Sequence, residues 1–584
     1  MNRGNFIRKL LGPSGQNGFV VSAFILILFS FSPTIYEALH VEAVEKGGRE
    51  LILEHGYTPD FNLYLSKMRQ GADGVWLARE LYTSEDHAPS LLQIFYVLLG
   101  KLGSSLGLSL VATYHAARLF LGATLLLGIY YLATKLFPKS LWALGAFWLA
   151  ITTSSWPIIK WSDVLAGIWR YGKYLGWWTI IDPTFRITIT PHLLAGQTLL
   201  VFFVIGFLDV FKKGNLWKQA MLLGIFALVM GLVFPPALLL VYMIIWGTLG
   251  LNIRGMSSLE ALLGFIKDHR GDVLFAFIVT VISFPIFPYI AHLTSFYPWK
   301  RLNDYNVLYP TYFPIHEFAL ACGIAFILAL GGASIIVWKR LKEKEHNSGY
   351  ERFFPIIAWI AGIFIFMILI RKNPEQNALR FTQVVHYVPI GMLAAYFLQR
   401  LSQSGRKKFH IVCRWGTGIL FALTILLGVG HMAQSLAWQI DFSRARVYAG
   451  YPQIPIFPQV VYPPKEFMDT LRFIDKNLPK DSVLLAEETF GNYIPAYTGR
   501  RVYCCHANTP DVEGRRLNIW GFLWGLSDEY AKQLLKNWHV DYIVFGWQEK
   551  EQAAKAGYSD LGKRYTFLQR VYQNGQVSVY KVPK

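Results

Sequence analysis

The 584-residue chain contains few charged residues, 16% of the total, and only four cysteines. Soluble domains have about 25% charged residues, so this composition excludes a soluble multidomain protein of ordinary type. Cys322 and Cys413 stand alone in apolar runs and Cys504 is adjacent to Cys505, a spacing that predicts neither a disulfide framework nor a zinc site. The sequence shows no internal repeat, and its C-terminal part has no G-x-G-x-x-G, P-loop, H-E-x-x-H or G-x-S-x-G motif.

Hydrophobic residues, in contrast, make up 53% of the chain and gather in long runs. A bilayer core of about 30 Å is crossed by about 20 apolar residues in a helix. Runs of that kind recur from Val20 to Met432 but not after Leu436, so we predict a mainly α-helical, polytopic membrane protein with about eleven crossings. The predicted spans are 20–36, 111–134, 141–159, 192–210, 216–234, 235–251, 273–290, 318–338, 354–370, 388–401 and 411–432.

The 56 lysines and arginines outnumber the 37 acidic residues and give a formal charge of +19. They cluster in alternate short loops between the apolar runs, as the positive-inside rule requires of cytoplasmic loops, so the charge indicates membrane topology and no nucleic-acid partner. We predict a multi-pass plasma-membrane protein with a cytoplasmic N-terminus and a retained first helix. A transmembrane domain of residues 1–435, with a large outside loop at 37–110, then precedes an extracytoplasmic domain of residues 436–584.

Residues 90–106, inside the first outside loop, form an apolar but short run. A crossing at this point would break the alternation of charge between the loops. We therefore predict a helix that lies along the outer membrane surface. A short tilted span is the alternative.

The tail after Phe442 alternates helical and strand patterns. A helix, a turn with proline, a strand near residues 482–486, a second helix and a second strand are followed by another helix–strand pair. Asn574 and Gly575 predict the turn of a final β-hairpin. The tail is therefore predicted to be a small α/β domain.

Asp60 follows the first predicted span closely and is flanked by Tyr57, Phe61 and Tyr64. A carboxylate near the outer interface can accept a proton from a substrate hydroxyl within hydrogen-bond reach. Thr58 and Asp60 are equally suited to cap the start of a helix, and spacing alone favours the cap.

Glu85, Asp86 and His87 form an acidic cluster later in the same loop. Carboxylate oxygens and an imidazole suit a divalent cation such as magnesium or manganese. Acidic residues in a loop are more often solvated surface, so a metal site and a solvated loop both remain open.

Basic residues in outside loops run against the topology signal, so another role can retain them. Arg371, Lys372 and Arg380 stand at the predicted outer mouth of two spans, and Gln383 follows one helical turn after Arg380. A guanidinium here can bind a phosphate bidentately, or it can extend to lipid headgroups. Arg118, just inside the second span, predicts a charge that faces protein or a wet cavity.

The second outside loop combines Asp163, Asp182, Arg186 and His192 with five tryptophans. Aromatic rings can stack on sugars, but tryptophan and tyrosine also form the ordinary belt at a membrane interface, which is the favoured interpretation. The third outside loop, residues 292–317, is rich in proline and tyrosine and suits a lid.

Several of these segments together resemble a known family. They are the early outside acid Asp60, the stretch Ala88-Pro89-Ser90-Leu91, the segment LVATYHAARLFLGATLLLGIYYLATKLF with Arg118, and the outside acid Asp163. The pattern resembles the bacterial members of the GT-C glycosyltransferase superfamily, which contains protein O-mannosyltransferases and aminoarabinose transferases. The first half of the span region carries the resemblance best, Arg380 and Gln383 carry it more weakly, and the tail only as an architecture. Where the family has Asp-Glu followed by Tyr, this chain has Asp60-Phe61 with Tyr64, which leaves metal assistance open.

The resemblance implies a glycosyltransferase in which Asp60 is the catalytic base. It implies inverting transfer from a polyprenyl-phosphate sugar donor to a glycan, lipid or protein acceptor at the outer face of the membrane, among membrane lipids. Arg380 is expected to stabilise the leaving phosphate in the same pocket. The predicted substrate-binding residues are Tyr64, Arg118, Asp163, His192, Arg371, Lys372, Arg380 and Gln383.

Two other classes of protein fit the same composition. A transporter or flippase is also polytopic, although such proteins usually contain repeated halves with broken helices, and no repeat is present here. A non-catalytic scaffold whose outer domain binds glycan is the other candidate. Substrate flux without product would favour the first, and glycan binding without turnover would favour the second.

Overall fold

The computed structural model describes residues 13–167, 172–175, 179–210, 215–253, 264, 266–310, 314–342, 349–404, 410–448 and 462–583. The chain forms two compact units. Unit 1 comprises Met1–Ser32, Arg118–Pro288 and Pro310–Trp438, and unit 2 comprises Pro33–Ala117, Tyr289–Tyr309 and Gln439–Lys584.

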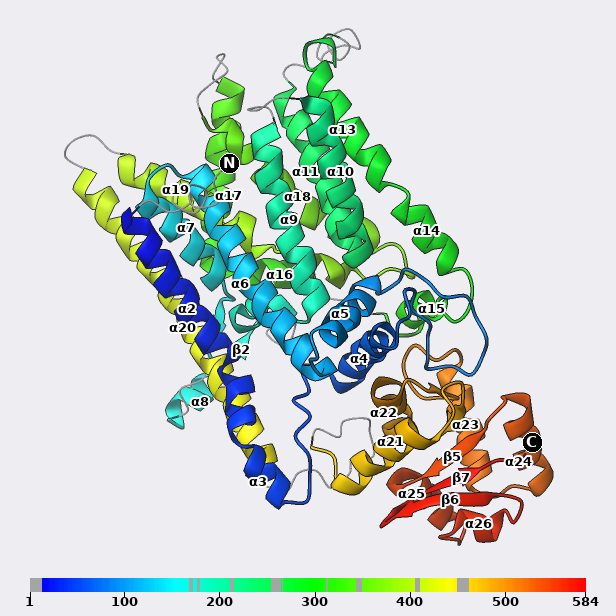
Figure 1. The fold of residues 1–584 in the computed structure, drawn as a ribbon. Helices are drawn as coiled ribbons and strands as arrows, with labels where there is room; N and C mark the ends of the chain where they lie inside the picture. Colours follow the sequence, from blue (N-terminus) through cyan, green and yellow to red (C-terminus); the bar gives the residue numbers. More distant parts are fainter. Residues whose placement is uncertain are drawn as a thin grey trace. The chain divides into compact units, whose positions relative to one another are not determined.

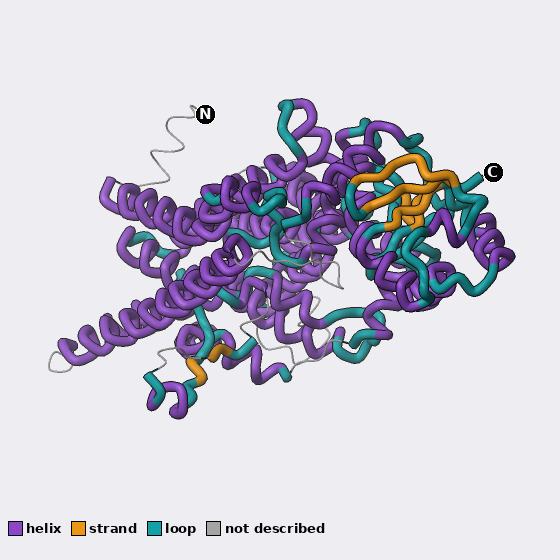
Figure 2. Tube along the Cα trace, turned by 90° about the horizontal axis from the view of Figure 1, so that it is seen from below, coloured by secondary structure: helices purple, strands orange, loops and turns teal. Residues whose placement is uncertain are grey.

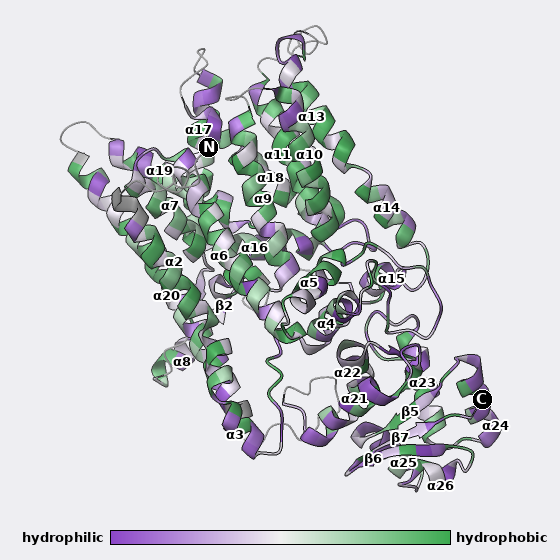
Figure 3. Cartoon of the chain, viewed as in Figure 1, coloured by the Kyte–Doolittle hydropathy of each residue, from purple (hydrophilic) through white to green (hydrophobic). Residues whose placement is uncertain are grey.

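Unit 1 is built from apolar helices, which Figure 3 shows as hydrophobic along most of their length. Within the described part of the chain, nine helices are long and apolar enough to cross a membrane. The predicted polytopic helical architecture is thus confirmed. The helices wholly or partly in unit 1 are α2 (Pro13–Leu39), α6 (Leu110–Leu136), α7 (Ser140–Thr152), α8 (Trp161–Leu165), α9 (Pro191–Asp209), α10 (Leu216–Val233), α11 (Pro235–Asn252), α13 (Arg270–Ser283), α14 (Ile286–Leu293), α16 (Ile315–Ala321), α17 (Gly323–Lys342), α18 (Phe354–Ile370), α19 (Tyr387–Gln403) and α20 (His410–Tyr448).

Two of the predicted spans are shorter than expected. The run 141–159 forms helix α7 over only 13 residues, because the polar stretch from Thr153 to Ser155 leaves the helix and Pro157 cannot continue it. The run 388–401 forms α19, a helix of 17 residues that is buried almost all round. A helix that is apolar on every side belongs in the interior of a bundle.

Helix α19 packs closely against α7 and α17 because small residues face its neighbours. A Cβ atom on Gly391 would stand 2.4 Å from the backbone of Ala150, and one on Gly332 would stand 2.3 Å from the carbonyl oxygen of Leu393. Small residues at such contacts let helix backbones approach each other, as is common where apolar helices associate in membranes.

The second outside loop of the prediction lies in unit 1 as a set of short elements. Strands β1 (Pro157–Ile158) and β2 (Gly172–Lys173) pair antiparallel, and the 3-10 helices η1 (Thr179–Ile181) and η2 (Pro183–Ile187) follow them. Two further 3-10 helices, η4 (Glu351–Phe353) and η5 (Ala378–Gln383), flank helix α18.

Unit 2 contains a five-stranded sheet in the order β4-β3-β5-β7-β6, the strands seen together in Figure 2. Strands β4, β3 and β5 are parallel, and β7 and β6 are antiparallel to their neighbours. The predicted α/β tail is confirmed (Figure 1). Its strands are β3 (Val483–Leu485), β4 (Arg501–Val502), β5 (Tyr542–Phe545), β6 (Gln569–Asn574) and β7 (Val577–Lys581), and its helices are α21 (Lys465–Asn477), α22 (Glu488–Thr498), α23 (Val512–Leu523), α24 (Asp528–Asn537), α25 (Trp547–Lys555) and α26 (Leu561–Arg564).

The final hairpin turns where the sequence predicts it. Asn574 pairs with Val577, and Gly575 between them has a φ of 52°. This left-handed backbone is accessible to glycine at little cost, which is why the Asn-Gly pair marks the turn.

The loop predicted to be the first outside loop and the tail belong to the same unit, unit 2. Its remaining helices are α3 (Val41–Lys46), α4 (Thr58–Ala72), α5 (Ile94–Ser105) and α15 (Arg301–Leu308). The unit boundary between Trp438 and Gln439 lies near the predicted boundary at residue 436, but residues of the predicted loop 37–110 pack with the tail. Helix α4 contacts α22, which joins segments more than 400 residues apart in sequence.

Helix α5 accounts for part of the apolar run 90–106. It has 12 residues, fewer than the about 20 that cross a bilayer core. It packs against α4 through Gly100 and Gly71, where an added Cβ atom would stand 1.9 Å from the Met68 and Val97 carbonyl oxygens. Its place along the membrane surface stays a prediction.

Cys504 and Cys505 form a disulfide bond, which the spacing of the four cysteines did not predict. Frameworks are recognised from cysteines spaced along the chain, and two adjacent cysteines give no such spacing. Both side chains are buried in the core of the tail.

Candidate functional site

The candidate base, Asp60, lies in the first turn of helix α4 and is exposed. Pro59 occupies the start of the helix, where its missing N–H costs nothing. The N-cap is Tyr57, which makes no side-chain cap hydrogen bond, and the Thr58 hydroxyl donates to Glu54 over 2.7 Å. Thr58 and Asp60 thus stand at the start of the predicted helix, as the capping interpretation requires, but the N-cap position belongs to Tyr57. The Asp60 carboxylate is placed at the surface of unit 2.

The backbone beside Asp60 is held by the tail. His506 is buried and stacks on Tyr82 with 4.4 Å between ring centroids. The Asn508 N–H donates to its Nδ1 over 3.0 Å, so the proton is on Nε2, which donates to the Pro59 carbonyl over 3.3 Å. Burial lowers the pKa of His506 to about 4, which keeps the ring neutral in this role.

One turn further along α4, Asn62 is fully buried and donates to the Asn492 side chain over 2.5 Å. Arg69, in the last turn, forms an ion pair with Asp475 at 2.7 Å. These two contacts and the His506 contact reach the tail from the start, middle and end of α4, so the tail fixes the direction of the helix that carries Asp60.

The surroundings of Asp60 are rich in polar groups. Tyr57 interacts electrostatically with Asp60, Glu488 and Tyr305. Partial burial, together with the Asp60 and Glu488 charges, raises the pKa of Tyr57 to about 12. Glu488 forms an ion pair with Arg516 at 2.8 Å, and its burial raises the pKa of its carboxyl. The described surface around Asp60 therefore offers carboxylates, phenols and one guanidinium to a polar ligand.

The predicted metal ligands Glu85, Asp86 and His87 do not come together. Glu85 forms an ion pair with Arg515 at 2.7 Å, and Asp86 forms one with Arg501 at 2.8 Å. His87 accepts a hydrogen bond from the Glu80 N–H through Nε2. Within the residues described, no group of three or more His, Cys, Asp or Glu side chains is placed to hold a metal ion, so these residues do not fit the predicted cation.

Tyr64, one helical turn after Asp60, belongs to an apolar cluster. Its ring stacks on Tyr96 with 4.4 Å between centroids, and both pack near Phe61 and Tyr114. One face of the Tyr64 ring is therefore used in packing. The predicted role of Tyr64 in substrate binding stays a prediction.

In unit 1 the structure brings Arg380, Gln383 and His192 together. Arg380 is exposed in η5 and its guanidinium donates to the Gln383 side chain over 3.4 Å. The Arg380 charge also acts on His192 at the start of α9. These three predicted residues, from two distant segments, therefore share one place in unit 1.

The other predicted residues of unit 1 have separate places. Arg371 and Lys372 are exposed at the end of α18, and Asp163 is half-buried in the short helix α8. Arg118 is buried, donates to the Thr188 carbonyl over 2.8 Å and lies over the Phe31 ring. Arg118 thus holds the segment that leads into α9.

A second buried arginine, Arg186, fastens the same loop. Its guanidinium donates to five carbonyl oxygens, those of Ala150, Ile151, Thr153, Ile180 and Ile181, and lies 4.4 Å from the Tyr387 ring. Asp182 accepts from the Thr184 N–H over 2.9 Å and pairs with Lys173 at 2.7 Å. These contacts hold residues 172–175 and 179–190 in place before His192.

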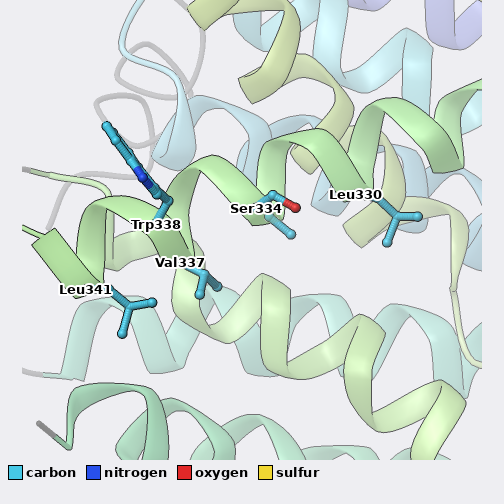
Figure 4. A pocket seen from close by; sticks show the side chains of 6 residues that line it. Leu330, Ser334, Val337, Trp338 and Leu341 are labelled. Atoms are coloured by element: carbon cyan, nitrogen blue, oxygen red, sulfur yellow. The ribbon is translucent and has the colours of Figure 1, made fainter. Parts of the chain in front are cut away.

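Unit 1 also carries a shallow groove of about 370 Å³ on one face of α17 (Figure 4). Its lining is apolar except for the Ser334 hydroxyl. The groove offers no general acid, base or nucleophile. It is lined by Leu330, Ala333, Ser334, Val337, Trp338 and Leu341.

Comparison with known proteins finds its matches among solved structures. The chain is similar to an archaeal oligosaccharyltransferase. The apo enzyme of Archaeoglobus fulgidus aligns over 97% of this chain and 74% of its own, with a TM-score of 0.49 and 13% identity. The same enzyme in complex with an inhibitory peptide and a dolichol-phosphate aligns over 95% of this chain and 74% of its own, with a TM-score of 0.48 and 12% identity. Its complex with zinc and sulfate aligns over 94% of this chain and 74% of its own, with a TM-score of 0.44 and 14% identity.

These likenesses concern the fold, and we take no site residue from them. No family model and no curated protein matches the chain.

Sequence reasoning missed the residues of the tail that surround Asp60. Glu488, His506 and Arg516 lie more than 400 residues after Asp60 and carry no motif. The sequence contains no signal that pairs α4 with α22, because both helices show only ordinary helical patterns. Only the packing of the first loop against the tail reveals them.

Proposed function

We propose that the chain is an integral membrane glycosyltransferase that transfers a sugar from a polyprenyl-phosphate-linked donor to an acceptor hydroxyl outside the cytoplasm. The observation that carries the proposal is the Asp60 carboxylate, which is exposed in the first turn of a helix that it does not cap. Five polar or charged side chains form hydrogen bonds or ion pairs within helix α4 or beside it. They are Asn62, Glu488, Asn492, His506 and Arg516.

In the proposed reaction, Asp60 accepts the proton of the acceptor hydroxyl. The oxygen forms a bond to the anomeric carbon while the bond from that carbon to the phosphate oxygen breaks on the opposite face, so the configuration inverts. The leaving group is the polyprenyl phosphate, and Arg380 stabilises the charge that grows on it. That Asp60 of unit 2 and Arg380 of unit 1 act on the same substrate stays a prediction of the proposal.

Arg380 suits the second role because its guanidinium is exposed and, within the described part of the chain, donates one long hydrogen bond, to Gln383 over 3.4 Å. A planar guanidinium can bind two phosphate oxygens at once. Gln383 and His192 then orient that guanidinium or the phosphate.

The extracytoplasmic position of the reaction rests on charge and on the disulfide. The basic loops alternate as the positive-inside rule predicts and leave the tail outside. The bond between Cys504 and Cys505 in the core of the tail suits an oxidising compartment. Both arguments point the same way, although they use different residues.

The experiment that tests the proposal replaces the chromosomal gene with the Asp60→Asn variant and compares surface glycoconjugates by mass spectrometry with those of a deletion strain. We expect Asp60→Asn to reproduce the glycoconjugate loss of the deletion, because removing a general base lowers the rate about 10²- to 10⁴-fold. Asp469→Asn, which alters an exposed carboxylate paired with Arg472 in the same unit, should behave as wild type.

Equal amounts of folded protein in the membrane, measured by immunoblot and size-exclusion profile, are required of each strain. A full glycoconjugate pattern in the Asp60→Asn strain would remove Asp60 from the mechanism. A deletion strain with unchanged glycoconjugates would instead remove the transferase function itself.

A further inference from the structure

Two arginines of unit 1 lie against one aromatic pair at the end where the charge pattern predicts the cytoplasm. Arg352 belongs to η4 before α18, and Arg400 belongs to the last turn of α19. Their guanidinium carbons lie 5.6 Å from the Phe353 ring and 5.1 Å from the Tyr396 ring. These two rings are themselves in contact, with 4.7 Å between centroids.

The two guanidinium groups are near enough to repel each other electrostatically, and Tyr396 lies beside both. Among the residues described, neither forms an ion pair with a carboxylate, and both are only partly accessible to water. Two like charges in a half-buried place are unfavourable unless a negative charge accompanies them.

Their hydrogen-bonding groups are also unsatisfied. The buried Nε atoms of Arg352 and Arg400 have no hydrogen-bond partner within the described residues. The same holds for the hydroxyl of Tyr396, a side chain that is 2% exposed, and for the buried hydroxyl of Tyr350. Buried donors are nearly always paired in folded proteins, so several orphans in this part of the chain indicate a partner that is not among the described residues.

Arg340, which lies near the same cluster, shows what a purely structural arginine does here. Its guanidinium donates to the carbonyl oxygens of Leu251 and Asn252 at the end of α11 and lies over the Phe354 ring. A cation that binds the last carbonyls of a helix is a common way to satisfy them. Arg352 and Arg400 make no such contact with the residues that the structure describes, which separates them from the helix-capping role of Arg340.

We propose that Arg352, Arg400 and Tyr396 form a binding site for a phosphate-type oxyanion at the predicted cytoplasmic end of the helix bundle, distinct from the proposed reaction at the outer face. An oxyanion supplies one negative charge or more and several acceptor oxygens. Each guanidinium can donate from Nε and one Nη to such a group, and the Tyr396 hydroxyl adds a third donor. The anion is either the headgroup phosphate of a membrane lipid or a free phosphate, since both present the same oxygens.

Binding to the purified full-length protein, in a phosphate-free buffer and a neutral sugar detergent, tests this site. Three probes are titrated separately: inorganic phosphate, dioctanoyl phosphatidate, and dioctanoylglycerol, which differs from phosphatidate only in lacking the phosphate. We expect phosphatidate or phosphate to bind the wild-type protein, and the double variant Arg352→Gln, Arg400→Gln to bind it at least about tenfold more weakly, because two charge-assisted hydrogen-bond donors are lost. Tight binding of phosphatidate alone identifies a lipid headgroup, and equal binding of inorganic phosphate identifies a free anion.

Two single variants keep the test sharp if the double variant folds poorly. Tyr396→Phe removes only the orphan hydroxyl, so it should weaken phosphate or phosphatidate binding several-fold while the ligand-free protein melts no lower than wild type. Lys342→Gln removes an exposed cation over the Trp338 ring, on a neighbouring helix, and should bind as wild type. Equal affinity of wild type, double variant and Tyr396→Phe for all three probes would overturn the proposal, and so would equal binding of dioctanoylglycerol and phosphatidate without any binding of phosphate.

Discussion

A buried ion pair connects helix α4, which carries Asp60, to the loop that follows it. Lys67 and Glu80 are almost completely buried, with 3.3 Å between Nζ and Oε2. Nζ also donates to the Arg79 carbonyl over 2.7 Å and lies 5.6 Å from the Trp299 ring. Burial lowers the pKa of Lys67, and the Glu80 charge opposes that shift, so the ammonium depends on its partner.

The perturbation is Glu80→Gln, which keeps the size of the side chain and removes its charge. The Lys67 ammonium then remains buried without a counter-charge, which typically costs about 3–5 kcal/mol. For a unit of this size, each kcal/mol lowers the melting temperature by about 2–4 °C, so the expected loss is about 6–20 °C. The double variant Lys67→Met, Glu80→Gln removes both charges and should recover most of that loss, because replacing a buried pair by apolar groups is often neutral.

Thermal unfolding of the purified full-length protein, followed by tryptophan fluorescence, measures these shifts. The more exposed pair of Arg472 and Asp469 in the same unit serves as the control. Asp469→Asn should cost far less, since exposed pairs are worth about 0–1 kcal/mol. A Glu80→Gln variant that melts within a degree of wild type, or a double variant that melts as low as the single one, would show that the pair is not what holds the loop to α4.

The remaining predictions concern the tail. Burial, with the Glu487 charge nearby, raises the pKa of Glu549 to about 7, above its usual value of 4.5. The folded state therefore binds this proton more tightly than the unfolded state, so stability should fall by about 3 kcal/mol as the pH rises from about 4.5 to about 7, and Glu549→Gln should flatten that part of a pH-dependent unfolding curve. Replacing His506 by leucine should lower kcat with little change in the donor KM, because Pro59 loses its hydrogen bond, whereas His506→Gln, which restores a donor, should recover part of kcat in the same assay. Asn492→Ala should lower the unfolding free energy in denaturant by about 1–3 kcal/mol, because the buried Asn62 amide loses its partner.

The membrane region shows how much of the fold hydropathy can predict. Nine of the predicted spans correspond to helices long and apolar enough to cross, because length and composition alone decide that property. Helix α7 is shorter than its apolar run, since Thr153 to Ser155 and Pro157 end it locally. The apolar sequence of helix α19 predicts a buried helix or a crossing, but which helices pack around it cannot be predicted from its composition.

The tail shows the same division between local and distant information. The hairpin at Asn574 and Gly575 could be predicted because two residues contain its turn. Glu85 and Asp86, in contrast, suggested a metal site because their partners Arg515 and Arg501 lie more than 400 residues away. Ion-pair partners that are distant in sequence cannot be recognised from the sequence alone. An acid that forms an ion pair therefore cannot be distinguished there from an acid that binds a metal ion.

The place of the first loop changes how mutations in the tail must be interpreted. Asp60 lies on a helix whose start, middle and end are held by His506, Asn492 and Asp475 of the tail. Removing the tail would leave the buried Asn62 and Tyr82 without their partners, so loss of activity on truncation would not show that the tail takes part in the chemistry. A point variant that changes kcat while the unit stays folded separates the two cases. The hydrogen bond from His506 to the Pro59 carbonyl, next to Asp60 in sequence, is therefore the contact at which the tail's contribution to catalysis can be measured apart from its contribution to stability.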